Sequence, residues 1–259
     1  MALELHAYPD IAYRDGTDGP TDLAEQRELW KWEAAIGYRM FAALRWGQLG
    51  DGHITCRDPE RRDCFWMLSY GVPFHRATVH DMILIGPDGS VVEGPAHATA
   101  NTAGYNIHQP LLEVRQDINA AAHTHTAFGT PWSANVEPFR AISQESCSFV
   151  FNQAMYLGED LEVDSTDGGY RIAEAMGTNT LVILRNHGLL TGGLSPAEAV
   201  GWFAIAERVA EVHVKAPNGK AISDEMAKHI AVSFEEPAMG WRTWQWLARD
   251  LVPDPSVVL

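Results

Sequence analysis

The sequence predicts one mixed α/β domain, and three observations support this fold class. Segments with apolar residues at three- and four-residue steps alternate along the chain with short β-rich runs. No internal repeat or low-complexity segment interrupts that alternation. The 259 residues are 46% apolar and 20% charged, which is the composition of an ordinary globular protein with enough apolar residues for one large core.

The first part of the chain predicts an arm, a long helix and a set of strands. Proline and glycine punctuate residues 1–20, so we expect an N-terminal arm there and the domain over residues 21–259. Asp22 followed by Glu25 is a helix-start signature, and apolar residues recur from there to Trp46. Short strands are predicted at 53–57, 64–68, 82–85 and 90–93, with the last two joined as a β-hairpin.

The second part continues the alternation. It predicts a helix at 105–114, a strand at 118–126, helices at 146–157 and 168–176, and a buried strand at 180–184. Ser195, Pro196 and Glu198 combine an N-cap, a proline in the first turn and a capping box, so a helix is expected from there to about residue 215. Tryptophans at helical spacing predict a short aromatic helix at about residues 240–251.

Charge and composition exclude several function classes. The formal net charge is −15, and no run of five basic residues occurs, so nucleic acid and anionic membranes are not expected partners. No apolar stretch reaches the roughly 18 residues of a spanning helix, and the N-terminus lacks a signal-peptide pattern. The three cysteines contain no Cys-x-x-Cys pair, which argues against a disulfide framework. We therefore expect a soluble, cytoplasmic protein.

Three histidines form the strongest chemical signal. His123 and His125 are two residues apart on a predicted strand, so their side chains point to the same face. His187 follows the buried strand at 180–184, and Gly188 after it permits a sharp turn. Three imidazoles would suit Zn, Fe, Ni or Cu and leave positions open for substrate. The alternative is that His123 and His125 are ordinary hydrogen-bonded residues at a strand end.

Together these motifs resemble the class II aldolase/adducin family. The matching stretches are residues 52–57, 71–74 and 103–108, His123-Thr124-His125, and residues 185–192. The resemblance implies a central, largely antiparallel sheet flanked by helices and a homotetramer with sites near subunit boundaries. It also implies one divalent metal ion, Zn, Fe(II) or Mn, held by His123, His125 and His187.

The chain departs from the family's sugar-phosphate aldolases at the substrate positions. Those enzymes carry a serine pair that holds phosphate and a glutamate that moves a proton, whereas this chain has Thr102-Ala103 and Gly104 there. Tyr70 replaces a small residue of a second phosphate-binding turn, and His53 replaces an asparagine. The pattern is closer to the adducin-like branch, which includes aromatic-acid decarboxylases and the iron-dependent oxygenases of aminocoumarin biosynthesis.

We therefore predict a divalent-metal-dependent enzyme. It would cleave a C–C bond of a small, non-phosphorylated, aromatic oxo or hydroxy acid, by aldol cleavage or decarboxylation. One alternative is a mononuclear non-heme Fe(II) oxygenase that performs oxidative decarboxylation of an arylpyruvate-like acid. A second is a non-catalytic, adducin-like interaction module, which the complete histidine triad disfavours.

Further residues are candidates for proton transfer and substrate binding. The catalytic candidates are His53, His108, Tyr105 and Glu145. The candidates for substrate contact are Tyr70, Gln144, Trp241 and Trp244, with the aromatic helix acting as a lid over the pocket. Each has a structural alternative: a packed histidine, an aromatic core residue, a solvated polar side chain, or a helix packed away from the metal.

Overall fold

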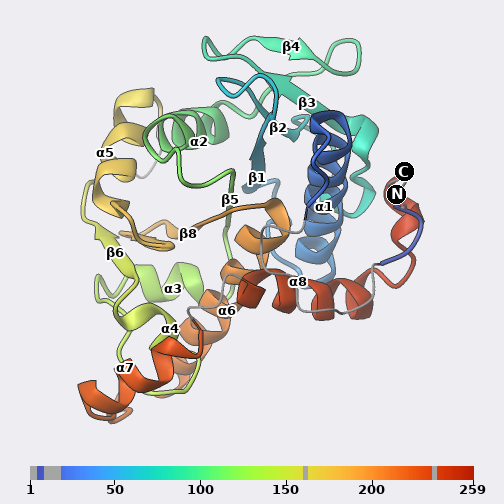
Figure 1. Ribbon diagram of the computed structural model, residues 1–259. Helices are drawn as coiled ribbons and strands as arrows, with labels where there is room; N and C mark the ends of the chain where they lie inside the picture. Colours follow the sequence, from blue (N-terminus) through green and yellow to red (C-terminus); the bar gives the residue numbers. More distant parts are fainter. Residues whose placement is uncertain (1–4, 9–18, 160–162, 235–237) are drawn as a thin grey trace.

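The computed structural model describes residues 5–8, 19–159, 163–234 and 238–259 (Figure 1). Within these residues eight strands form one sheet, in the order β4-β3-β2-β1-β5-β8-β7-β6. Neighbouring strands are antiparallel, except that β6 and β7 are parallel. The strands are β1 (Gly52–Arg57), β2 (Phe65–Leu68), β3 (Met82–Ile85), β4 (Val91–Glu93), β5 (Ala120–Thr124), β6 (Gln153–Tyr156), β7 (Leu181–Leu184) and β8 (Gly188–Gly193). The predicted single α/β domain with a largely antiparallel sheet is confirmed.

Helices cover both faces of this sheet (Figure 1). One face packs against α1 (Leu23–Ala43), α6 (Pro196–Lys215) and α8 (Ala238–Leu251), and the other against α2 (Thr102–Val114) and α5 (Thr166–Met176). Alternate residues of β2 point to opposite cores, because side chains alternate along a strand: Trp66 joins the α1 side and Met67 the α2 side. The short helices are α3 (Gly129–Ser133), α4 (Cys147–Val150) and α7 (Asp224–Val232). No described helix is long and apolar enough to cross a membrane.

Local signals in the sequence fix where the long helices begin and how closely they pack. The Asp22 side chain accepts hydrogen bonds from the amides of residues 24 and 25, and the Ser195 hydroxyl accepts one from the amide of Glu198. At the crossing of α6 and α8, a Cβ atom on Gly201 would lie 1.7 Å from the carbonyl oxygen of Gly240. Glycine is therefore required there, because the two helix backbones are in contact.

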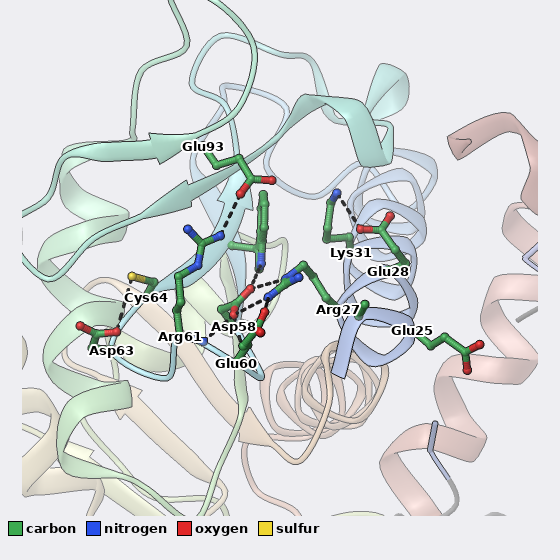
Figure 2. Close-up of polar contacts among 12 residues, drawn as sticks. Glu25, Arg27, Glu28, Lys31, Asp58, Glu60, Arg61, Asp63, Cys64 and Glu93 are labelled. Carbon is green, nitrogen blue, oxygen red and sulfur yellow. Dashed lines mark hydrogen bonds and ion pairs between the residues drawn. The ribbon is translucent and has the colours of Figure 1, made fainter. Parts of the chain in front are cut away.

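An ion-pair network fastens α1 to the turn between β1 and β2 (Figure 2). The Asp58 carboxylate accepts from Arg27 Nε at 2.6 Å and from Trp66 Nε1 at 2.9 Å. It also accepts from the backbone amides of Glu60 and Arg61, and its side chain is fully buried. This network holds the C-terminal end of β1 in place, at the opposite end of the strand from His53.

Some sequence expectations were wrong or incomplete. The predicted helix at 146–157 is instead the short α4 followed by β6, which pairs with β7. The sequence predicted neither β8 nor the helices α3 and α7. Most of the expected arm lies outside the described residues. Within residues 5–8, the Tyr8 hydroxyl donates to the carbonyl of Val252 at 2.7 Å and its ring packs against Trp244, so this part is fastened to α8.

Candidate metal centre

The structure brings the three predicted ligands together. His123 lies near the end of β5, His125 follows that strand, and His187 lies in the turn between β7 and β8. One ring nitrogen from each can be chosen so that all three lie within 4.8 Å of one another. The ring planes are close to perpendicular, with centroid separations of 4.8 to 5.4 Å. Three ring nitrogens this close together are near enough to bind one ion.

Polar contacts behind two of these imidazoles hold the rings so that Nε2 is left for a ligand. Nδ1 of His123 lies 2.7 Å from the carbonyl oxygen of Leu189, which can only accept, so Nδ1 carries the hydrogen and Nε2 is left for a metal. Nδ1 of His125 lies 3.2 Å from Oδ2 of Asp51, which leaves its Nε2 free in the same way. A carbonyl or carboxylate behind the imidazole is the usual support of a metal-binding histidine. The donor set therefore fits a divalent cation.

The backbone holds His187 and the segment after His125 in place. Asn186 has φ of 55°, a left-handed conformation that asparagine tolerates, and its amide donates to the carbonyl of Ser133. Glu207 of α6 accepts from the Thr126 hydroxyl at 2.6 Å and from the Gly129 amide at 2.7 Å. These contacts fix the two turns that carry His187 and His125.

Burial favours the neutral form of two of the imidazoles, His123 and His187. It lowers the pKa of His187 to about 4, with a further contribution from His125 beside it. The pKa of His123 falls well below its ordinary value for the same reason, followed by the effect of His187. A neutral imidazole is the form that can bind a metal, and desolvation and crowding favour that form for His123 and His187 at neutral pH.

His53 and His108 form a second, connected pair on the α2 side of the sheet. His53 lies directly opposite His123 in the β1–β5 register, with ring centroids 5.1 Å apart. Its Nδ1 is 2.8 Å from Nε2 of His108, whose Nδ1 is 2.6 Å from Oγ1 of Thr55. Burial, followed by the neighbouring His123, lowers the pKa of His108 to about 3. This chain of hydrogen bonds fixes the His53 ring and leaves its Nε2 available.

The changes at positions 53 and 104 are physically coupled. A Cβ atom on Gly104 would lie 2.9 Å from Cδ2 of His53 and 3.0 Å from Cε of Met67. The His53 ring therefore occupies the space into which a side chain at position 104 would project. In the sequence, His53 and Gly104 are two separate departures from the aldolase pattern. In the structure they are one exchange, because the imidazole of His53 takes the place of a side chain at position 104 of α2.

The other predicted residues lie in different places. Tyr70 is exposed and lines a cavity of about 310 Å³ that also includes Gly52 and Met67. Tyr105 donates its hydroxyl to the carbonyl of Pro87 at 2.8 Å, in the turn before β4, so it is not free to carry a proton at the histidines. Glu145 pairs with Arg208 of α6 at 3.2 Å. Gln144 is exposed beside Glu145.

The tryptophan lid is wrong for Trp241 and Trp244. Both belong to the core on the α1 side of the sheet, whereas His53 and His108 lie on the α2 side. Trp244 is 0% exposed and packs edge-on against Trp32 with centroids 5.7 Å apart. A side chain that is fully covered within its own subunit has no surface left for a substrate, so these tryptophans stabilise the packing of α8.

Sequence reasoning missed several supporting residues. Asp51 behind His125, Thr55 behind His108 and Glu207 behind the segment after His125 were not singled out. Asp51 had one usable signal, because it is an acidic residue close to a strand predicted to carry His53. The contacts of Thr55 and Glu207 join segments distant in sequence, so no local pattern points to them.

Comparisons with known proteins agree with this fold and site. The model of the class II aldolase and adducin N-terminal domain matches residues 33–214. The decarboxylase NovR of Streptomyces niveus is 30% identical, with 90% of this chain and 88% of that protein aligned. The 4-hydroxy-3-prenylphenylpyruvate oxygenase/4-hydroxy-3-prenylbenzoate synthase of Streptomyces roseochromogenus subsp. oscitans is also 30% identical, over 86% and 81% of the two chains.

Solved structures show the same architecture. L-fuculose 1-phosphate aldolase from Glaciozyma antarctica PI12 superposes with a TM-score of 0.80 at 27% identity, covering 91% of this chain and 94% of that one. The family match, the aligned relatives and the shared fold all span most of the molecule, including the three histidines. The chain therefore belongs to the class II aldolase and adducin family.

Proposed function

We propose that the chain is a divalent-metal-dependent enzyme that breaks a C–C bond of a small, non-phosphorylated oxo or hydroxy acid carrying an aromatic group. The reaction would be aldol cleavage or decarboxylation. The observation that carries this proposal is the cluster of three imidazoles in a chain that is 30% identical to a decarboxylase. The substrate is a small organic acid, and the active form of the protein is a cytoplasmic homotetramer.

His123, His125 and His187 would hold one ion, Zn, Fe(II) or Mn. When bound, such an ion acts as a Lewis acid that polarises a carbonyl group and stabilises the negative charge left by a breaking C–C bond. Asp51 and the Leu189 carbonyl keep two of the ligands in the required tautomer.

His53 is the residue we assign to proton transfer. Its ring stands beside His123 and fills the space in front of Gly104, and its Nε2 is not used in the bond to His108. His108 is fully buried, so it positions His53 rather than touching a substrate. Because burial and the adjacent His108 lower the pKa of His53, the ring is a neutral donor or acceptor that returns a proton readily once it has taken one.

An Fe(II)-dependent oxygenase is the second candidate. The similarity to the prenylphenylpyruvate oxygenase favours it specifically. Three imidazoles suit Fe(II) as well as Zn, so the same residues serve both reactions. The non-catalytic adducin-like role is the third candidate, and the complete triad of histidines argues against it.

The test is anaerobic purification, elemental analysis and an assay of metal-loaded protein. Phenylpyruvate, 4-hydroxyphenylpyruvate and pyruvate are each offered with and without O₂, and CO₂, aldehyde and O₂ are measured. Release of CO₂ or aldehyde without O₂ supports the lyase, and metal-dependent O₂ consumption supports the oxygenase. The proposal is overturned if metal-free and metal-loaded protein behave identically. The control variant is His229→Ala, which removes an exposed histidine of α7 and should show the same metal dependence as the unchanged protein.

A further inference from the structure

An apolar cavity of about 310 Å³ lies between the segment before β1 and the segment after β2. Among the described residues that line it, none carries a charged side chain, and polar groups such as Ser69 and Asn101 are neutral. The larger apolar and aromatic residues of the lining are Tyr38, Leu49, Met67, Leu68, Tyr70, Val72, Pro73 and Phe74. This composition favours a hydrocarbon or aromatic group over an anion.

Two residues that line the cavity, Leu49 and Met67, contact residues of the candidate metal centre or their immediate surroundings. The Leu49 amide donates to Oδ1 of Asp51, and the other oxygen of that carboxylate contacts His125. At the inner end, Met67 Cε and His53 Cδ2 both approach the same point, the Cβ position of residue 104. The cavity therefore lies next to the segments that carry His53 and His125, because Gly52 and Met67 line it.

We propose that this cavity is the subsite for the uncharged, apolar end of the substrate, and that Met67 forms its inner wall and limits the length of the group accepted. The inference rests on the proposed function, which places the acid end of the substrate at the histidine cluster. A cavity of ~150 Å³ is enough to hold benzene, so one of about 310 Å³ accommodates an aromatic ring with a short substituent. A phosphate would enter it without a cationic partner, which carries a large desolvation cost.

The mouth of the cavity supports an apolar occupant. Leu49 is 92% exposed and Tyr70 is 64% exposed, so two large apolar side chains face water at the rim. A bound aromatic group would remove both from water, which is favourable in proportion to the apolar area covered. A second copy of the chain could cover the same rim, and the experiment separates these occupants.

Binding of a neutral aryl probe tests the subsite without turnover. ¹⁹F NMR measures the affinity of 4-(trifluoromethyl)benzyl alcohol for the full chain, with and without added Zn²⁺. We expect saturable binding that does not depend on the metal and is not displaced by dihydroxyacetone phosphate. Tyr70→Ala should weaken it about tenfold. The control Tyr170→Ala, which alters a tyrosine of α5 outside the cavity, should leave the affinity unchanged.

The role of Met67 is tested with a longer probe. Met67→Ala lengthens the cavity, so 4-tert-butylbenzyl alcohol should gain at least threefold in affinity relative to the trifluoromethyl probe. Met226→Ala, an exposed methionine of α7, should not change that ratio. Met67 is almost fully buried, so Met67→Val serves in place of the alanine variant if the latter fails to fold.

Several outcomes would overturn the subsite. They are no saturable binding, an unchanged affinity in Tyr70→Ala, an unchanged probe ratio in Met67→Ala or Met67→Val, and displacement by dihydroxyacetone phosphate. A change of sedimentation coefficient in Tyr70→Ala with intact probe binding would assign the rim to contact between copies of the chain. Because the probe has no carboxylate, probe binding without any C–C cleavage would refute the proposed function alone. Cleavage without probe binding would refute the subsite alone.

Discussion

Two aspartates flank β1, and their surroundings are opposite. Asp58, after the strand, has a fully buried side chain that accepts hydrogen bonds from Arg27, from Trp66 and from the amides of residues 60 and 61. Asp51, before the strand, has a side chain that is 26% exposed and contacts the imidazole of His125. A carboxylate whose acceptor positions are filled by the fold stabilises the fold. A carboxylate that supports one imidazole at the surface serves the site instead.

The same contrast holds for the charges around each aspartate. Near Asp58, opposite charges are paired, as Figure 2 shows for Arg27 with Asp58 and for Arg61 with Glu93. Near Asp51, four imidazoles crowd together, and burial lowers the pKa of three of them, His53, His123 and His187. The first region is complete without a ligand, whereas the second has the donor groups of a cation site.

The largest expected effect is a loss of stability on substitution of Asp58. Asp58→Ala leaves the Trp66 indole without its acceptor and leaves Arg27 paired with Glu60 alone, so the cost should be about 3 kcal/mol, the lower end for breaking a buried pair. Urea denaturation at pH 7 should show that loss in the free energy of unfolding. Zinc affinity measured below the unfolding transition should match that of the wild type, and a large loss of affinity would show that the two regions are coupled.

The next effect is at the metal centre. His187→Ala removes one of three ligands, so Zn²⁺ affinity should fall by more than the 10- to 100-fold typical of losing a supporting residue. Competition with a chromogenic chelator measures the affinity, and His229→Ala is the matched control. The metal-free variant should unfold at about the same urea concentration as the wild type. Full metal occupancy in His187→Ala would refute the triad.

A pH titration should expose the Asp58 contribution. Burial by itself raises the pKa of Asp58, but the hydrogen bonds from Arg27, Arg61 and Trp66 outweigh it and lower the pKa from 3.8 to about 2. The stabilisation is therefore fully present above pH 4 and is lost as the pH falls from about 4 to 2, amounting to about 2 kcal/mol. Asp58→Ala should lack this component in metal-free protein. An identical acid transition in both proteins would contradict the assignment.

The smallest effect is expected for Asp51→Asn. The amide can still hydrogen-bond to His125 but no longer supports it with a negative charge, so Zn²⁺ affinity should fall about tenfold, the lower end for such a contact because the pair is partly exposed. The free energy of unfolding of the metal-free protein should change by less than about 0.5 kcal/mol. A loss of stability comparable to that of Asp58→Ala would remove the contrast between the two aspartates.

The sequence by itself determined the features that depend on neighbours along the chain. Helix starts at Asp22 and Ser195 are set by side chains that bond to amides two or three residues away. Strand geometry predicted a common orientation of His123 and His125, although β5 ends at Thr124, one residue before His125. Gly188 marked the turn that carries His187. Such signals were enough to predict the α/β class and the three candidate ligands.

Only the tertiary structure decided what depends on residues distant in sequence. Residues 153–156 became a strand because β7 pairs with them, although their apolar spacing also suits a helix. Packing likewise settled three further features. They are the face of the sheet on which Trp244 packs, the contact of Asp51 with His125, and the exchange of His53 for a side chain at Gly104. Each of these features requires two segments to meet at a particular register and depth. Register and depth are not set by neighbouring residues, because they emerge from the collective burial of the core.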